Sequence, residues 1–251
     1  MRTFFQRLAA AVLAFGWLSH AASAAQCTAA SGDRRVPLLE LYTSEGCDSC
    51  PPVDRWVSDL PTRGFGVDRL VVLAFHVDYW DYIGWRDPFA HARFSERQRA
   101  ANARIGSRTI YTPQLMLNGR DLRDRDTARI AEIGRSAPQA SIRFAVAPAP
   151  AHFDVTGSWS AGEAAARQAQ GWLALYENRL ANNVRAGENR GKRLQHDFVV
   201  RDIVGPLPAG NFTQKFTLDT RWKRNELGVA AFVQDARTGE ALQALALPGC
   251  G

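Results

Sequence analysis

Two nearly continuous apolar runs, with a helical spacing between them, dominate the first half of the chain. The stretches 36–43 and 70–77 carry few polar residues, which is typical of strands buried on both faces of a parallel sheet. Between them, over 53–60, apolar residues recur at spacings of three and four, and this spacing predicts a helix. Because two parallel strands joined by a helix form a right-handed βαβ unit, we expect one here.

Weaker patterns predict the elements that follow this unit. Helical patterns cover 90–105 and 121–133, and a short apolar run over 114–118 predicts a strand. That strand ends at Asn118-Gly119, a dipeptide typical of tight hairpin turns. The first half therefore has an α/β pattern.

The pattern changes near residue 140. Prolines punctuate the region, and helical spacings give way to short alternating runs. Several such runs within about a hundred residues are typical of a β-sandwich. The runs are 142–146, 153–155, 172–176, 198–204, 212–218, 229–233 and 242–247. Between two of them, we expect 188–191 to form a hairpin turn that contacts the first half of the chain.

The N-terminus has the pattern of a secretory signal peptide. Arg2 and Arg7 precede the apolar stretch 8–18, which is too short to span a membrane, and small residues follow it. We therefore expect residues 1–25 to be removed on export to the periplasm or the medium, where disulfides persist. The polar segment 28–35 is expected to be a loose lead-in.

Composition and charge bear on the number of domains and on the class of partner. With 251 residues and 46% hydrophobic content, the chain can bury the cores of two domains. Loss of the two signal-peptide arginines lowers the formal net charge from +6 to +4, since 29 Lys and Arg then face 25 Asp and Glu. Such mild basicity does not predict nucleic-acid binding.

Four cysteines carry the candidate chemistry. Cys47 and Cys50 lie at the turn between the first predicted strand and helix, a local geometry typical of thiol–disulfide redox sites. Because a helix N-terminus stabilises a thiolate, we expect Cys47 to be the nucleophile and Cys50 the resolving thiol. A small structural disulfide is the alternative. If these two pair, Cys27 is left with Cys250, and their disulfide would join the ends of the mature chain.

Residues within and after the motif refine the expectation for this pair. We expect Cys47 to be more accessible than Cys50, which lies behind Pro51. Proline disfavours helical dihedrals in the residue before it, so the helix should begin only at Pro51 and its dipole should help Cys47 less. The carboxylate of Asp48 would also disfavour a nearby thiolate. Both features predict a reducing pair rather than a strong oxidant.

A set of segments spread over most of the mature chain matches a known pattern. They are 40–52 (ELYTSEGCDSCPP), 75–82 (FHVDYWDY), Gly84-Trp85, Arg97-Gln98, 111–114 (YTPQ), Asn118-Gly119 and Glu188-Asn189. In this combination the chain resembles the DUF1223 family, a largely uncharacterised family of exported, thioredoxin-like bacterial proteins. The resemblance implies an α/β thioredoxin-like domain over 26–138, followed by an all-β, immunoglobulin-like sandwich domain over 139–251. It does not define a substrate, because fold alone does not establish activity.

The resemblance also implies roles outside the cysteine motif. Thr112-Pro113 is similar to the cis-proline segment that faces the redox pair in thioredoxin-like folds, and an ordinary trans proline is the alternative. His76 ends the second buried strand, at the edge where α/β sheets bind ligands, although a core role is the alternative. The candidate substrate-binding residues are His76, Asp78, Trp80 and Tyr111.

Three functions fit these residues. The first is an exported thiol–disulfide oxidoreductase, favoured as a reductase or isomerase. It would act on protein dithiols or disulfides through Cys47 and Cys50, need no cofactor, and receive electrons from a membrane donor. The second is a periplasmic metal-binding module in which Cys47, Cys50 and His76 hold Cu(I), because zinc would require a fourth ligand. The third is a non-catalytic envelope binding protein with a structural Cys47–Cys50 disulfide.

Overall fold

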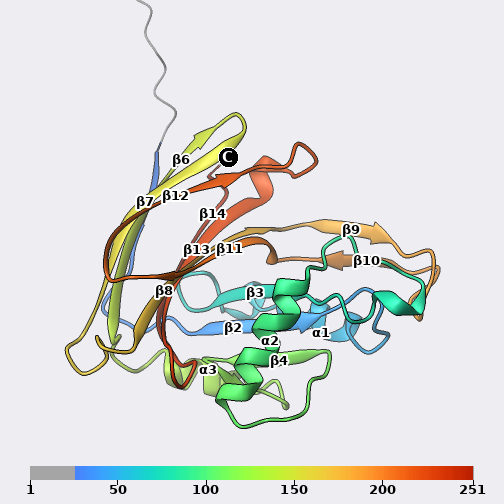
Figure 1. The fold of residues 1–251 in the computed structure, drawn as a ribbon, viewed down its shortest axis with the longest axis horizontal. Coiled ribbons are helices and arrows are strands. Elements are labelled where there is room, and N and C mark those ends of the chain that lie inside the picture. The colour runs from blue at the N-terminus through green and yellow to red at the C-terminus, as the bar shows by residue number, and fades with distance from the viewer. Residues whose placement is uncertain (1–25, 251) are drawn as a thin grey trace, which may run out of the picture.

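The computed structural model describes residues 26–250, and the predicted signal peptide, 1–25, lies outside them. The described part is mostly β-structure with few helices. It contains an eight-stranded mixed sheet, a four-stranded antiparallel sheet and a two-stranded hairpin. Figure 1 shows the four-stranded sheet at the left of the molecule and the α-helices toward the right.

The elements follow one another along the chain with these bounds. They are β1 (Cys27–Ala30), β2 (Leu38–Thr43), α1 (Pro51–Ser58), η1 (Pro61–Arg63), β3 (Val71–His76), η2 (Asp81–Ile83), α2 (Ala92–Arg104), β4 (Gln114–Leu117), β5 (Arg120–Asp121), α3 (Thr127–Ile133), β6 (Ala140–Ala149), β7 (His152–Ala161), β8 (Ala169–Glu177), β9 (Leu180–Asn183), β10 (Arg193–His196), β11 (Val199–Leu207), β12 (Gly210–Thr217), η3 (Arg224–Glu226), β13 (Leu227–Asp235) and β14 (Ala241–Pro248).

The predicted strand–helix–strand unit is present as β2, α1 and β3. The two strands are parallel, with Leu38 opposite Val71 and Thr43 opposite His76. Every residue of both strands is buried, which explains why neither strand alternates polar and apolar positions. The observed bounds lie within two residues of the predicted ones.

Helices cover both faces of this part of the sheet. α1 and α3 lie on one face, where Trp56, Val57 and Ile130 share a core with alternate residues of β2, β3 and β4. α2 lies on the other face and buries Phe94 and Ala101 in a second core. Successive side chains of a strand point to opposite faces, so the same strands feed both cores.

The same sheet continues into the second half of the chain. Its strand order is β14-β13-β8-β11-β3-β2-β4-β5, and β11 joins the first half by pairing in parallel with β3. The boundary predicted between residues 138 and 139 falls between α3 and β6, yet the sheet extends across it. The second half therefore has no separate pair of sheets, because one layer of its sandwich belongs to the large sheet.

The four-stranded sheet β1-β6-β7-β12 is the other layer of that sandwich. Its inward residues Phe144, Val155 and Phe216 share a core with Leu175 of β8 and Val229 of β13. The neighbouring residues of β8 and β13 belong to the core on the α2 face. The large sheet is thus covered by α2 on one face, and by the small sheet together with α1 and α3 on the other.

Two expectations about local structure are wrong. The lead-in 28–35 is not loose at its start, because β1 pairs with β6. The helix predicted over 121–133 begins only at Thr127, since the Asp126 side chain accepts a hydrogen bond from Ala128 N–H and caps it there. The hairpin turn expected at 188–191 lies between β9 and β10, but these two strands were not predicted, because each has only four residues of mixed burial. Each of the predicted β-runs of the second half coincides with a strand.

The two ends of the described chain are joined. A disulfide links Cys27 in β1 to Cys250 after β14, over a sequence separation of 223 residues, as the spare cysteines predicted. Among the helices of residues 26–250, none combines the length and the apolar character needed to cross a bilayer.

Candidate functional site

The cysteine motif occupies the turn between β2 and α1, as the sequence predicted. Cys47 and Cys50 form a disulfide, with their Cα atoms 5.4 Å apart. Backbone hydrogen bonds run from Cys47 N–H to Ser44 O (3.2 Å) and from Cys50 N–H to Cys47 O (3.3 Å), and they close the turn. Pro51 begins the helix, where its missing N–H leaves no hydrogen bond unmade.

The backbone of Cys50 differs from the expectation for a residue before proline. α1 begins at Pro51 as expected, but Cys50 has helical dihedrals, φ −73° and ψ −43°. The reason is that its carbonyl accepts hydrogen bonds from Val53 N–H (2.9 Å) and Asp54 N–H (3.0 Å), which hold it in the first helical turn. The helix therefore reaches the disulfide, and the expected weakening of its dipole at Cys47 does not follow.

Both cysteines are buried, so the expectation that Cys47 is more accessible than Cys50 is wrong. Each residue is 0% exposed. Two segments lie against the cysteine turn. One is 184–192, which joins β9 to β10 and which we call the covering loop. The other contains Trp80, which lies so close to Gly46 that a Cβ added to the glycine would be 3.1 Å from the Trp80 Cβ.

The covering loop is held to the cysteine turn by side-chain hydrogen bonds. Asn189 Nδ2 donates to the carbonyl oxygens of Glu45 and Cys47, both at 2.8 Å. The Glu188 carboxylate accepts from Asp48 N–H at 3.0 Å. These contacts confirm the expectation that 188–191 touches the first half of the chain, and they hold the loop against the backbone at Cys47.

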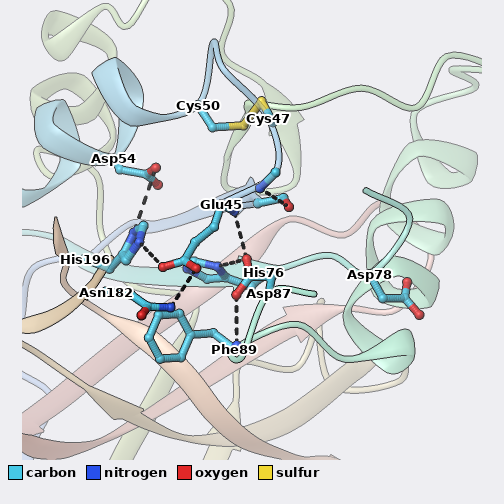
Figure 2. Close-up of polar contacts among 12 residues, drawn as sticks. Glu45, Cys47, Cys50, Asp54, His76, Asp78, Asp87, Phe89, Asn182 and His196 are labelled. Atoms are coloured by element: carbon cyan, nitrogen blue, oxygen red, sulfur yellow. Dashed lines mark hydrogen bonds and ion pairs between the residues drawn. A yellow bond between two sulfur atoms is a disulfide. The ribbon is translucent and has the colours of Figure 1, made fainter. Parts of the chain in front are cut away.

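Five ionisable side chains gather beneath the disulfide, as Figure 2 shows. They are Glu45, Asp54, His76, Asp87 and His196, and none is more than 4% exposed. Because an unpaired buried charge is strongly unfavourable, the imidazoles pair with the carboxylates. His76 Nδ1 lies 2.7 Å from Asp87 Oδ2. His196 Nε2 lies 3.2 Å from Glu45 Oε1.

Further hydrogen bonds fix two of these carboxylates. Glu45 Oε2 accepts from Trp85 Nε1 (2.9 Å) and Asn182 Nδ2 (3.0 Å). The Asp87 carboxylate accepts from the backbone N–H groups of Glu45 (2.8 Å) and Phe89 (2.9 Å). The cysteine turn, the 85–89 segment and the β9–β10 hairpin are therefore tied together through this cluster.

Burial and pairing act in opposite directions on the pKa values of the cluster. Burial raises the pKa of Asp54, because desolvation outweighs the positive charges of His196 and His76. Burial alone would lower the pKa of His196, but its hydrogen bond to Glu45 and the charge of Asp54 raise it. Burial alone would raise the pKa of Asp87, but the charge and hydrogen bond of His76 lower it.

The residues predicted to contact substrate occupy different places. His76 lies within the buried cluster. Asp78 binds Ser95 of α2 and points away from the disulfide in Figure 2. Trp80, beside the cysteine turn, donates from Nε1 to Thr112 Oγ1 at 2.6 Å and so connects the motif to the Thr112-Pro113 segment.

The Thr112-Pro113 peptide bond is cis, as predicted. Pro113 and Tyr111 line an open cavity of about 490 Å³ together with Val53 of α1. Burial and a 2.6 Å hydrogen bond from the Tyr111 hydroxyl to Asp121 raise the pKa of Tyr111 to about 12. Tyr111 is therefore a neutral hydrogen-bonding group at the wall of this cavity.

The ligand set of the copper hypothesis is not assembled in this form of the protein. Within residues 26–250, no group of three or more His, Cys, Asp and Glu side chains has an arrangement that could hold a metal ion. His76 Nδ1 is occupied by Asp87, and the two sulfurs are bonded to each other.

Comparison with known proteins places the chain in a family. A family model described as "Protein of unknown function (DUF1223)" matches residues 38–234, which include the cysteine turn, the buried cluster and the covering loop. The chain belongs to the DUF1223 family. The resemblance inferred from its sequence segments is thereby confirmed.

Two solved structures are similar to this DUF1223 protein. Protein AGR_C_4864 from Agrobacterium tumefaciens is 26% identical in sequence, with a TM-score of 0.63 over 87% of this chain and 96% of that chain. HBP35 of Porphyromonas gingivalis is 14% identical, with a TM-score of 0.65 over 87% of this chain and 76% of that chain, and this likeness concerns the fold alone. No curated protein matches the chain significantly.

Sequence reasoning missed four of the five clustered residues of this DUF1223 protein. Asp54 carried a usable signal, because it precedes Val57 by three residues and so lies on the apolar face of α1. For Glu45 the only signal in the sequence was its nearness to the cysteine motif, and for Asp87 it was its nearness to the aromatic segment. His196 carried none at all, because it lies 151 residues from Glu45 in sequence and meets it only in the folded chain.

Proposed function

We propose that this protein is an exported thiol–disulfide oxidoreductase that acts as a reductase or isomerase on protein disulfides. The observation that carries the proposal is the Cys47–Cys50 disulfide at a strand-to-helix turn, above a buried cluster of acids and imidazoles. Ionisable groups with perturbed pKa values beside a reactive pair are typical of functional sites. Export is supported by the two disulfides, which persist in oxidising compartments.

We propose that the two halves of the chain form two different structural units. We interpret the elements from β2 to α3 as a thioredoxin-like unit, because a parallel β2–β3 pair, antiparallel β4 and helices on both faces surround the cysteine turn. We interpret the two β layers of the second half as an immunoglobulin-like sandwich that has fused with the sheet of the first unit.

The proposed exchange is a two-step transfer of electrons. In the reduced protein, the Cys47 thiolate attacks a substrate disulfide, a bond forms between Cys47 and one substrate sulfur, and the other substrate sulfur leaves as a thiolate. Cys50 then attacks Cys47, the internal disulfide forms, and the second substrate sulfur leaves. Two electrons have passed to the substrate, no organic cofactor is used, and a membrane dithiol donor restores the reduced pair.

Acidic groups around Cys47 support the reducing direction. Asp48 is exposed next to Cys47, and the Glu188 carboxylate accepts from Asp48 N–H at 3.0 Å. A backbone N–H that could stabilise a nearby thiolate is therefore already used by a carboxylate. Because such surroundings disfavour the Cys47 thiolate, they favour the disulfide and lower the reduction potential of the pair.

Substrate would bind beside the cysteine turn. The cavity beside Val53, Tyr111 and Pro113 has a mixed lining of apolar side chains, the Tyr111 hydroxyl and two arginines, Arg123 and Arg125, which suits an extended protein segment. The covering loop has to move for a substrate sulfur to reach Cys47, because this residue is fully buried in the disulfide form. The expected partners are thus a protein disulfide and a membrane electron donor.

Covalent trapping tests this function. Cys50→Ser should accumulate a mixed disulfide between Cys47 and a model disulfide protein, because the resolving step is blocked. Cys47→Ser should form none and serves as the matched control. Equal labelling of both variants, or of neither, would contradict the proposal.

A second candidate function is a non-catalytic envelope binding protein with a structural Cys47–Cys50 disulfide. The full burial of both cysteines favours it, because structural disulfides resist reduction. The two candidates differ in their response to mild reductant. A structural pair should stay oxidised in dithiothreitol concentrations that fully reduce a catalytic pair.

A further inference from the structure

The resolving cysteine has no direct route to water for its proton. Cys50 is 0% exposed, yet it must lose a proton to become the thiolate that attacks Cys47. A buried group close to Cys50 would therefore have to accept that proton. This requirement rests on the proposed oxidoreductase function.

Asp54 meets this requirement by its position on α1. Its N–H donates to Cys50 O at 3.0 Å, so the two residues are one helical turn apart. Side chains four residues apart lie on the same face of a helix. Figure 2 shows the Asp54 carboxyl group below the disulfide, on the side of the buried cluster.

The Asp54 carboxyl group is incompletely paired. Its Oδ2 atom is buried and has no hydrogen-bond partner among the described residues. The same is true of His196 Nδ1, which lies 3.9 Å from that oxygen. A buried polar atom without a partner destabilises a fold by about 1–3 kcal/mol. This arrangement therefore has no structural advantage, but it leaves a carboxyl oxygen free to take up a proton.

His196 is fixed in turn by Glu45, which is bound by Trp85 and Asn182. The chain of contacts thus runs from Asp54 through His196 to a carboxylate that is itself fully paired. The other ionisable groups that face this chain are His76 and Asp87, which pair with each other. His76 Nε2 is also buried without a hydrogen-bond partner, but Asp54 is the member of the cluster that lies one helical turn from Cys50.

We propose that Asp54 is the proton acceptor for Cys50, and that His196, held by Glu45, is the positioning residue that keeps Asp54 able to accept. In the resolving step, the Cys50 S–H bond breaks and its proton passes to the Asp54 carboxylate. The Cys50 thiolate attacks Cys47, the Cys47–Cys50 bond forms, and the substrate sulfur leaves with the electron pair of the broken bond. When the disulfide is later reduced, Cys50 leaves as a thiolate and Asp54 returns the proton.

The disulfide form of the protein has the properties that this cycle requires. In this form Asp54 should hold the proton, and burial raises its pKa in agreement with that. The positive charge of His196, supported by Glu45, opposes burial and keeps the carboxyl group from being permanently protonated.

The test separates the two steps of exchange with oxidised glutathione. Reduced protein is mixed with this disulfide and quenched with acid, and mass spectrometry counts the dithiol, the glutathione adduct and the internal disulfide. In Asp54→Asn the adduct should form at the wild-type rate but decay at least about tenfold more slowly near pH 7, as expected for lost proton transfer. His196→Gln should slow the same step to a smaller extent.

The pH profile distinguishes proton transfer from a structural role. Above the usual thiol pKa of about 8.5, Cys50 ionises without help, so the decay rates of wild type and Asp54→Asn should converge. Asp59→Asn, at the exposed end of α1, is the matched control and should match wild type at every pH. Unchanged adduct decay in Asp54→Asn, or slowing by the same factor at all pH values, overturns the proposal. Failure of the wild-type protein to form any adduct would instead overturn the oxidoreductase function on which it rests.

Discussion

At the scale of single residues, the site is defined by how buried acids and imidazoles share charge. Asp87 and His196 are stabilised in their charged forms by their partners His76 and Glu45. Asp54 differs, because the charges of its neighbours do not offset burial, and burial raises its pKa. Asp54 is therefore the member of the cluster whose ionisation opposes folding.

This difference predicts how Asp54→Asn changes stability with pH. A raised pKa in the folded state gives stability that is present below the unfolded pKa, about 3.9, and is lost as the pH rises through the folded value. The free energy of unfolding of Asp54→Asn minus that of wild type should therefore increase from about pH 4 toward neutral pH. Urea unfolding at several pH values measures this slope. If the difference in the free energy of unfolding decreases with pH, the pKa of Asp54 is not raised by folding. If the difference is the same at every pH, ionisation of Asp54 does not affect stability.

At the scale of elements, the β9–β10 hairpin lies against the cysteine turn. Its covering loop is fastened mainly by Asn189, whose side chain binds the carbonyls of Glu45 and Cys47. Lys192 Nζ donates to Asn189 Oδ1 at 2.8 Å and orients that side chain. Since these bonds lie at the loop and not in the sheet, the loop can open while the sheet remains intact.

Asn189→Ala should therefore expose Cys47. The loss leaves buried carbonyls unpaired and should favour the open loop by about 1–3 kcal/mol, so reduction by dithiothreitol should be faster by about tenfold or more. Asn183→Ala, at an exposed position of the same hairpin, is the control and should behave as wild type. Equal reduction rates for Asn189→Ala and wild type would show that the covering loop does not limit access.

Sequence patterns predicted those elements whose burial is continuous or strongly periodic. β2, α1 and β3 lay within two residues of their predicted bounds, because buried strands and an apolar helix face leave a direct signal. The Cys47–Cys50 site followed from its place between them. β1, β9 and β10 were missed because each has only four residues, about half of them exposed. The dihedrals of Cys50 were missed because helical hydrogen bonds outweigh the bias of Pro51.

At the scale of the whole molecule, long-range pairing joins the two halves into one structure. β11 completes the large sheet by pairing with β3, and β10 brings His196 to the cysteine turn. Neither contact is predictable from local patterns, because alternation defines which face of a strand is buried but not which strand lies beside it. The candidate site is thus built from residues of both halves, of which the sequence indicated only those near the cysteines.

The terminal disulfide should stabilise this whole arrangement. Cys27 and Cys250 close a loop with a sequence separation of 223 residues, and chain entropy gives an upper limit of about 5 kcal/mol for such a loop. The double variant C27S/C250S should lower the free energy of unfolding by about 2–5 kcal/mol, measured by urea titration, while the Cys47–Cys50 pair remains oxidised. A loss below about 1 kcal/mol would show that β1 is held by its pairing with β6 alone.

The reduction potential of the Cys47–Cys50 pair decides whether the protein can act as a reductase. It is measured by equilibrating the protein with glutathione buffers and counting oxidised and reduced pairs by alkylation and mass spectrometry. We expect a value between about −200 and −280 mV, in the range of glutaredoxins and thioredoxin. A value near about −120 mV would contradict the reducing direction, and a value below about −300 mV would identify a structural disulfide and contradict the exchange function itself.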